Sequence, residues 1–585
     1  MSAPPAARPP RVARDKRAGV ARWAPGVGVL RAYRREWLPQ DLTAGVVLSA
    51  LLVPQGMAYA ELAGLPPITG LYATVVCLVA YAVFGPSPYL VLGPDSALGA
   101  MIAAVVLPLA AGDGSQAVAL AGALALLVGL ICTSAGVLKL GFVADLLSRP
   151  IRVGYLAGLA VTIFVGQLPK LLGFSVDAEG LLRELAATWQ GLDQTNLYAL
   201  AIGLVDLALI LGLKRRRSRI PGVLAAVVVS ILAVTVFDLT ARGVQVVGTL
   251  PQGFPAPSFP AVGLSDLPFL LAASVGISLV AIGDTIANSA GFAARRGYQV
   301  DSNQELVGIG SANLLAGVFQ GFPVSTSASR TAVAEQSGAK TQVTGLVAAA
   351  VVLSMMLFFP ALVRNLPQPA LAALVISASF TMFDLTELRR LFAMRRSEFA
   401  LAVACALGVA LVGVLGGIII AVSLAIGQFF ARAWRPYSAV LGQPAGVPGF
   451  HDLARYPDAA QIPGLLILRW DAPLFFANAG LFRDTVLQRL AAATSAPRLV
   501  LLAAEPITDV DTTAAKVLTD LDEDLNATGV HLAFAELKDP VKDKLVRYGL
   551  LETIDRRHFY PTLEVAVEAF AREAEGRQQE RENPR

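Results

Sequence analysis

The apolar residues of this chain are gathered into a series of segments that are long enough, or nearly long enough, to cross a bilayer as helices. Hydrophobic residues make up 55% of its 585 residues and charged residues only 15%, and the mean hydropathy is +0.61. A soluble protein of this length is much less apolar. Because about 20 apolar residues span the hydrocarbon as a helix, most of the chain is predicted to lie in a membrane.

The predicted membrane segments form two sets of seven. The first set lies at roughly 42–58, 68–84, 95–110, 117–140, 152–172, 197–213 and 221–237. The second set lies at roughly 268–290, 305–319, 325–337, 342–362, 367–384, 397–412 and 414–432. The third segment of each set is short and broken, which predicts two structural repeats. Since each repeat has an odd number of helices, the second copy is inserted upside down, and the predicted fold class is a polytopic all-α membrane domain of 14 TM segments in a 7+7 inverted repeat.

Lysine and arginine residues follow the even-numbered segments, as expected for short loops on the cytoplasmic side. The clusters after the fourth to fourteenth segments are Lys139, Arg149 and Arg152, then Lys214 to Arg219, Arg295 and Arg296, Lys340, Arg389 to Arg396, and Arg432 and Arg435. The other loops are sparser, and the exceptions are Lys170, Arg183, Arg242 and Arg364. This pattern predicts a multi-pass protein of the inner or plasma membrane with both termini in the cytoplasm.

Residues 1–36 are predicted to form a basic cytoplasmic tail. Arginine and lysine stand there among prolines and small residues, without the apolar core of a cleaved signal peptide. We expect residues 1 to about 30 to be disordered or loosely bound to the membrane surface. The membrane domain is predicted to cover residues 37–436.

The composition excludes several classes of function. Cys77, Cys132 and Cys405 occur singly within apolar segments, so neither a disulfide framework nor a zinc site is predicted. All three histidines follow the last apolar segment, which leaves carboxylates as the groups for proton chemistry in the membrane. No phosphate-binding loop, zinc-ligand spacing or nucleophile elbow is visible, and no basic face suggests nucleic acid. We predict no enzyme activity and no cofactor or metal besides a coupling H⁺ or Na⁺.

Two short apolar stretches are broken by proline at matching places in the two sets, at residues 93–99 and 322–330. In hydrocarbon every backbone N–H and C=O needs a partner within the protein, so interrupted helices persist only where they line a buried or watery cavity. Paired interruptions in two repeats point to a substrate site near the bilayer midplane. The unpaired N–H groups and positive dipole end of each half-helix, with Arg330 in the second, predict that the substrate is an anion.

After about residue 437 the composition is that of a soluble protein. Strands are predicted at 464–470, 498–504 and 530–535, and helices at 478–490, 512–526 and 541–548. This alternation predicts a small α/β domain with a mostly parallel sheet, over residues 437–572 on the cytoplasmic side. Residues 573–585 are expected to form a charged, frayed tail.

Several motifs resemble the sulfate permease (SulP) family of anion transporters, whose members carry a C-terminal STAS domain. The matching stretches are Val53 to Ala60 with Ala63 to Pro67 and Gly70 to Tyr72, then Asp301 to Leu306, and Ser327 to Thr331. The similarity runs from about residue 37 to 565. It implies a gate and a core domain built from the inverted repeat, alternating access by an elevator-like movement, and a homodimer.

The resemblance implies roles for residues of the two broken stretches. Arg330 is expected to contact the anion or to set the charge of its site, and the alternative is a structural ion pair with Glu335 or Asp284. Ser327 and Ser329 can donate hydroxyl hydrogen bonds to oxyanion oxygens, or can serve as small residues for close helix packing. Ser96 and Ala97, at the start of the first half-helix, complete the predicted substrate site on this side.

Gln55 and Tyr59 match a family position that lines the site, and both can hydrogen-bond an oxyanion without adding charge. Ordinary contacts between helices are the alternative. Asp95 departs from the family pattern, in which this residue is uncharged. It is predicted either to bind a coupling cation or proton, or only to cap the helix that follows.

Asp284 interrupts the eighth apolar segment, where relatives carry an acidic residue linked to cation coupling. A buried carboxylate can bind and release a proton near physiological pH, so a coupling role is predicted. A permanent ion pair with Arg330 is the alternative. In the soluble domain, Thr512 stands where signalling relatives have a phosphorylation site, and the alternative is that Asp511 and Thr512 cap a helix.

Together these features predict a secondary active inorganic-anion transporter, with proton-coupled sulfate uptake as the leading function. The rivals are sodium-coupled bicarbonate and proton-coupled C4-dicarboxylate transport, and then an anion channel or a membrane-anchored STAS signalling scaffold. The predicted partners are the anion, the lipid bilayer, a second copy of the chain and a cytoplasmic partner of the STAS domain.

Overall fold

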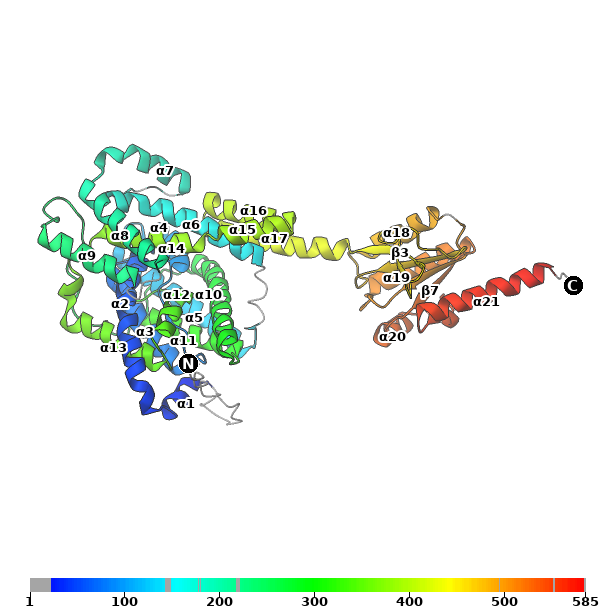
Figure 1. Ribbon diagram of the computed structural model, residues 1–585, viewed down its shortest axis with the longest axis horizontal. Coiled ribbons are helices and arrows are strands. Elements are labelled where there is room, and N and C mark those ends of the chain that lie inside the picture. Colours follow the sequence, from blue (N-terminus) through cyan, green and yellow to red (C-terminus); the bar gives the residue numbers. More distant parts are fainter. Residues whose placement is uncertain are drawn as a thin grey trace, which may run out of the picture. The chain divides into compact units, whose positions relative to one another are not determined.

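The computed structural model describes residues 23–141, 149–176, 178, 180–216, 221–493, 495–550 and 553–582. The predicted tail residues 1–22, and Arg217 and Arg219 of the basic clusters, lie outside this part. The chain divides into two compact units, Met1–Ala425 and Ile426–Arg585 (Figure 1). Each unit has its own apolar core.

The first unit is helical, and its segments lie side by side in Figure 1. Its helices up to residue 215 are α1 (Pro25–Arg31), α2 (Leu38–Leu62), α3 (Pro67–Phe84), α4 (Ser96–Ala110), α5 (Gly114–Val137), α6 (Arg149–Leu172), α7 (Leu181–Gln190) and α8 (Leu197–Arg215). The later ones are α9 (Gly222–Val236), α10 (Leu267–Arg296), α11 (Ser302–Val318), α12 (Ala328–Gln336), α13 (Val343–Phe358), α14 (Gln368–Met382), α15 (Leu385–Met394), α16 (Arg396–Val412) and α17 (Val414–Trp434), which continues into the second unit. Two short strands, β1 (Leu92–Gly93) and β2 (Ser325–Thr326), lie among them.

A helix overlaps every predicted membrane segment, but the helices differ in length. Among the described residues, seven helical stretches are long and apolar enough to cross a bilayer: Arg35–Leu62, Pro67–Phe84, Gly114–Val137, Arg149–Leu172, Leu197–Arg215, Leu267–Arg295 and Gln368–Met394. Helices α4, α9 and α13 are apolar but shorter. These helices make the chain a multi-pass membrane protein, while the count of fourteen spans stays a prediction.

Small residues allow the helices of this unit to pack closely. A Cβ atom on Gly70 of α3 would lie 1.9 Å from the Gly56 carbonyl oxygen of α2, and one on Gly154 of α6 would lie 2.1 Å from the Ala402 carbonyl oxygen of α16. Such contacts between backbones are how helices associate in lipid, where apolar burial alone gives little preference for a neighbouring helix.

A buried carboxylate joins α2 to the start of α13. Asp41 is fully buried, and its oxygens accept hydrogen bonds from the backbone N–H groups of Lys340 and Thr341 at 2.7 and 3.2 Å. The hydroxyls of Thr341, Thr344 and Tyr33 also donate to it, at 2.9, 2.9 and 3.0 Å. Five donors compensate the loss of water around this carboxylate and fasten α2 to the start of α13.

The second unit is an α/β domain. Its sheet has the order β4 (His451–Asp452), β3 (Ser438–Gly442), β5 (Leu465–Trp470), β6 (Leu499–Ala503), β7 (His531–Ala535) and β8 (Phe559–Tyr560). Strands β5 to β8 are parallel, and β3 is antiparallel to both its neighbours. The helices are α18 (Ala479–Ala491), α19 (Thr512–Ala527), α20 (Asp539–Arg547) and α21 (Leu563–Glu582) (Figure 1).

Alternate residues of the central strands build two apolar layers, as strand geometry requires. Leu466 and Leu468 of β5 join Phe482 of α18 and Leu521 of α19 on one face of the sheet. Leu465 and Ile467 alternate with these residues along β5. They join Ala566 and Phe570 of α21 on the other face.

The structure corrects some sequence-based expectations. Residues 25–31 of the predicted tail form α1, which contacts α3 and buries Gly26. The predicted frayed tail from residue 573 is helical as far as Glu582, because α21 continues through it. Strands β3, β4 and β8 and the amphipathic helices α7 and α15 were not predicted, since each is short and lacks a long apolar run.

Asp522 of α19 generates a pH-dependent prediction for the second unit. The residue is 2% exposed, and its carboxylate accepts a hydrogen bond from Asn526 at 3.0 Å. Burial raises its pKa from 3.8 to about 6. A raised carboxyl pKa favours the folded state below about pH 4, and this contribution is lost as the pH rises through about 6.

We therefore expect Asp522→Asn to stabilise this unit by about 1–2 kcal/mol at neutral pH, with a gain that shrinks as the pH falls below about 5. The change in stability is measured by heating the full chain in detergent and using proteolysis to detect unfolding of the second unit. The control is Asp520→Asn on the same helix, where an exposed ion pair with Lys516 at 2.7 Å is lost instead. A gain that does not change with pH would contradict the prediction.

Candidate functional site

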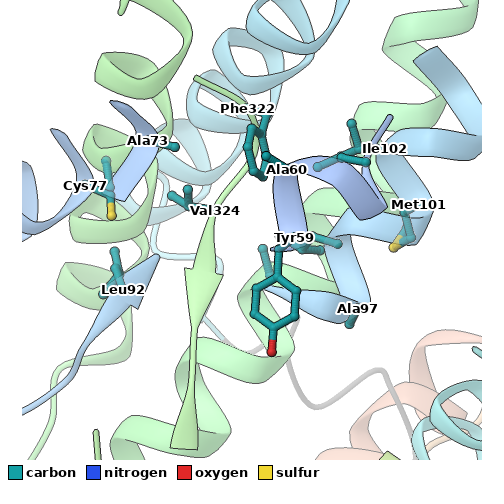
Figure 2. Packing of buried hydrophobic residues seen from close by; sticks show 14 of the residues in the cluster. Tyr59, Ala60, Ala73, Cys77, Leu92, Ala97, Met101, Ile102, Phe322 and Val324 are labelled. Atoms are coloured by element: carbon teal, nitrogen blue, oxygen red, sulfur yellow. The ribbon is translucent and has the colours of Figure 1, made fainter. Parts of the chain in front are cut away.

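The two broken stretches lie against each other as a short antiparallel pair of strands. Leu92 pairs with Thr326, and Gly93 pairs with Ser325. Helix α4 begins at Ser96 directly after β1, and α12 begins at Ala328 directly after β2. Figure 2 shows Leu92 and Val324 on these stretches, with Tyr59 and Ala97 beside them. The starts of two short helices are thereby brought to the ends of two paired strands.

Each helix start is capped by a polar side chain. The Asp95 carboxylate accepts a hydrogen bond from the Ala97 N–H at 2.9 Å, and the Ser327 hydroxyl accepts one from the Arg330 N–H at 3.5 Å. A cap satisfies only part of the free donors in the first turn of a helix. The remaining N–H groups and the helix dipoles give both starts a positive potential.

Arg330 joins the second stretch to the first. Its side chain is 1% exposed. One terminal nitrogen donates to the Gly93 carbonyl oxygen at 3.2 Å, and the other donates to the Pro94 carbonyl oxygen. Its Nε has no hydrogen-bond partner. Among the residues that the structure describes, Arg330 forms no ion pair with Glu335 or Asp284, the predicted alternatives, but it interacts electrostatically with Asp95.

Polar side chains that the sequence analysis did not single out hold the strand pair in place. The Asn313 side chain of α11 accepts from the Val324 N–H at 2.9 Å and donates to the Val324 carbonyl oxygen at 3.1 Å. The Thr331 hydroxyl accepts from the Val91 N–H at 3.1 Å, and Asn288 of α10 donates to the Thr326 hydroxyl at 3.0 Å. The only signal for Asn313 and Asn288 in the sequence was a polar amide within an otherwise apolar segment.

The other predicted substrate residues lie at different distances from Arg330. Tyr59 of α2 is 6% exposed and interacts electrostatically with Asp95 and Arg330, with its hydroxyl near Ser96. Gln55, also on α2, is buried, and its side-chain carbonyl oxygen has no hydrogen-bond partner among the described residues. The Ser96 hydroxyl lies 3.5 Å from the Met382 sulfur of α14.

The serines of α12 interact with each other. The Ser327 and Ser329 hydroxyl oxygens are 3.0 Å apart, and the Ser329 side chain is exposed. Ala97 is buried in the first turn of α4, so only its backbone N–H could contact a substrate. That N–H already donates a hydrogen bond to the Asp95 carboxylate.

Asp284 lies on α10 and is partly exposed. It interacts electrostatically with Asp95 of the first stretch and with Arg152 of α6. Tyr155, one turn after Arg152, interacts with both aspartates. The sequence analysis assigned Arg152 only to membrane topology, because a basic residue near a helix end is the usual sign of a cytoplasmic loop.

Thr512 is the first residue of α19 in the second unit, and its side chain is exposed. Asp511 caps this helix by accepting a hydrogen bond from the Ala514 N–H at 2.7 Å. The capping contact predicted as the alternative to phosphorylation is therefore present.

Comparisons with known proteins agree with this fold. The sulfate permease family model matches residues 38–405, and the STAS domain model matches residues 456–566. A probable sulfate transporter of Mycobacterium tuberculosis is 41% identical over 552 residues, which cover 94% of this chain and 99% of the relative. Probable sulfate transporter 4.2 of Arabidopsis thaliana is 31% identical over 558 residues, or 92% of this chain and 82% of the relative.

Two solved structures show the same fold. The murine Solute Carrier 26 family member A9 anion transporter in the inward-facing state has a TM-score of 0.87 at 24% identity, and the likeness covers 96% of both chains. The transmembrane domain of a cyanobacterium bicarbonate transporter has a TM-score of 0.60 at 23% identity, covering 66% of this chain and 98% of that one. With its matching membrane and STAS domains, this chain belongs to the sulfate permease family.

Proposed function

We propose that this protein is a secondary active transporter of inorganic anions, with sulfate as the leading substrate and proton symport as the leading mode of coupling. The proposed anion site is the junction of the α4 and α12 starts, lined by Arg330, Tyr59, Ser96 and Ser327. The sulfate transporters among its relatives support sulfate over other anions.

One observation carries this proposal: the positive charge of Arg330 is buried and forms no ion pair among the described residues, although the neighbouring Asp95 interacts with it electrostatically. Its hydrogen bonds to two carbonyl oxygens satisfy donors but leave its net charge in place. A desolvated charge of this kind is costly unless an opposite charge joins it. Together with two helix starts it forms a positive site, and an oxyanion supplies the missing negative charge.

The coupling ion is proposed to bind at Asp284, with Asp95 as a second carboxylate. Both lie within electrostatic range of each other, and Asp95 is adjacent to the proposed anion site. Moving one net charge across a membrane potential costs about 2.3 kcal/mol per 100 mV. Protonation of these carboxylates would offset the negative charge of a bound dianion, so the loaded site would cross with less electrical work.

The proposed movement is an elevator-like displacement of a core domain against a gate domain within a 7+7 inverted repeat. Helix packing supports this division. Helices α2, α3, α5, α10, α11 and α13 contact one another extensively, and so do α6, α8, α9, α14 and α16. Fewer contacts join the two groups, chiefly those of α2 with α14 and α9. The strand pair lies in the first group. We also propose a homodimer with both termini in the cytoplasm.

Sodium-coupled bicarbonate and proton-coupled C4-dicarboxylate transport remain the rival proposals for the same site. An anion channel would give no uphill accumulation. A signalling scaffold would tolerate changes at Arg330 and Asp284 but would lose its function without the STAS domain, whose proposed regulatory position is Thr512.

Asp284→Asn tests the proposed coupling. In proteoliposomes with an inward proton gradient and no sodium, the wild type should accumulate labelled sulfate uphill, and the variant should lose this accumulation because its amide cannot bind the coupling proton. The control is Asp266→Asn, which changes the residue before the first turn of the same helix and should retain uptake.

Unlabelled bicarbonate, fumarate and succinate serve as competitors in this assay. Transport of one of them, driven by sodium or protons, without any sulfate uptake would keep the anion site and overturn the substrate assignment. Equal uphill sulfate uptake by the wild type and by Asp284→Asn would overturn the role of Asp284.

Arg330→Gln tests the anion site. Hydrogen bonds to charged groups contribute about 1.5–3 kcal/mol each, so loss of the charge should raise the half-saturating sulfate concentration at least about tenfold. Equilibrium binding of labelled sulfate to the detergent-purified protein measures this effect. The control is Arg364→Gln, at an exposed loop position, and unchanged sulfate affinity in Arg330→Gln would exclude the site.

A further inference from the structure

Glu305 of α11 is a buried carboxyl group that the proposed transport cycle does not use. It stands in the motif Asp301 to Leu306, to which the sequence analysis assigned no chemistry. The side chain is fully buried. Its Oε2 accepts a hydrogen bond from the Tyr81 hydroxyl of α3 at 2.6 Å, whereas its Oε1 has no hydrogen-bond partner within the described part of the chain.

This environment is the opposite of that of Asp41, which is equally buried. Asp41 accepts five hydrogen bonds, two of them from backbone N–H groups at the start of a helix. Glu305 has one phenol, and the Ser87 hydroxyl nearby shares a 3.2 Å hydrogen bond with the Tyr298 hydroxyl. A carboxylate with so few donors would leave most of its charge uncompensated, whereas a carboxylic acid needs only one acceptor for its O–H.

Among the side chains that the structure describes, those around Glu305 provide no ion pair to offset an ionised form. Asp301, which caps the start of the same helix, has an unfavourable electrostatic interaction with an ionised Glu305. Titratable side chains also lie on the elements packed around Glu305. They are Tyr81 and Cys77 of α3, Cys132 of α5, Tyr89 and Tyr298 of the adjoining segments, Asp284 and Arg295 of α10, and Glu335 of α12. Glu335 interacts electrostatically with Tyr298. Arg295 stacks on Phe292, and no arginine or lysine among the described residues forms an ion pair with Glu305.

We propose that Glu305 is a further proton-binding site of the membrane unit, separate from Asp284 and Asp95 and occupied by a proton at neutral pH, with the Tyr81 hydroxyl hydrogen-bonded to its carboxyl group. When the solution becomes alkaline, this proton is released to water and an uncompensated carboxylate remains.

The position of this site links it to the anion site. Tyr81 and Ser87 flank the turn from α3 into residues 85–91, which lead directly to β1. Gln342 fixes that turn by donating to the Ser87 and Leu90 carbonyl oxygens at 2.8 and 2.9 Å. Further along the same segment, the carbonyl oxygens of Gly93 and Pro94 accept hydrogen bonds from the Arg330 side chain. Ionisation of Glu305 would therefore displace the segment that presents those two carbonyl groups and would weaken anion binding.

Infrared difference spectroscopy of the full-length protein tests the proton site without reference to transport. A carbonyl band of a protonated carboxylic acid should be present at neutral pH, and should be lost in Glu305→Gln but retained in Asp284→Asn. Tyr81→Phe should shift this band, because the hydrogen bond to the phenol is removed while the proton stays. A spectrum of Glu305→Gln identical to that of the wild type would overturn the proposal.

The link to the anion site rests on the proposed function and has its own test. In an Asp284→Asn background, which removes the first of the two proposed coupling carboxylates, sulfate affinity should fall several-fold as the pH is raised from neutral to alkaline. Adding Glu305→Gln should abolish that fall. If both variants lose affinity equally, the proposed link between Glu305 and the anion site is wrong. If neither variant binds sulfate, the proposed function fails, while the infrared result still decides whether Glu305 binds a proton.

Discussion

The guanidinium group of Arg330 and the carbonyl oxygens of Gly93 and Pro94 connect two stretches that are more than two hundred residues apart in the sequence. The strand pair alone joins only two residues from each stretch. Arg330 adds two hydrogen bonds from a buried cation, and Asn313 and Thr331 hold the strands from neighbouring helices. The starts of α4 and α12 depend on this junction for their positions, and so does the proposed anion site.

Buried charges in the membrane unit follow two different designs. Asp41 is surrounded by donors and fastens α2 to α13, which is a structural use of a charge. Arg330 donates hydrogen bonds to two neutral carbonyl groups. These bonds do not cancel its positive charge, which can therefore attract a ligand anion. Glu305 has few donors and no cation, which suits a neutral acid. The number and charge of the partners, rather than burial alone, separate these roles.

Apolar segment lengths and the pattern of basic residues predicted the helices of the first unit, because transfer into hydrocarbon depends on the composition of about twenty consecutive residues. The alternation of short apolar runs likewise predicted β5, β6 and β7 with their helices. Strands β1 and β2 could not be predicted in this way, since each contains two residues and owes its existence to a partner in the other half of the chain.

The candidate site was predictable only in part for the same reason. Proline and an arginine within apolar sequence identified residues 93–99 and 322–330 and Arg330. Asn313, Asn288 and Arg152 acquire their significance from contacts between helices, which no local pattern encodes. Gln55 shows the reverse, since a motif match singled it out, while its side-chain oxygen has no hydrogen-bond partner in the part of the chain that the structure describes.

The most direct test of the account is to locate a bound oxyanion. Selenate is an analogue of sulfate whose selenium can be identified by anomalous diffraction from crystals of the protein. The account predicts selenium at the junction of the α4 and α12 starts, with its oxygens within hydrogen-bond distance of the Arg330 side chain or the free N–H groups of those helices. Selenium bound elsewhere in the membrane unit, with this junction empty, would contradict it.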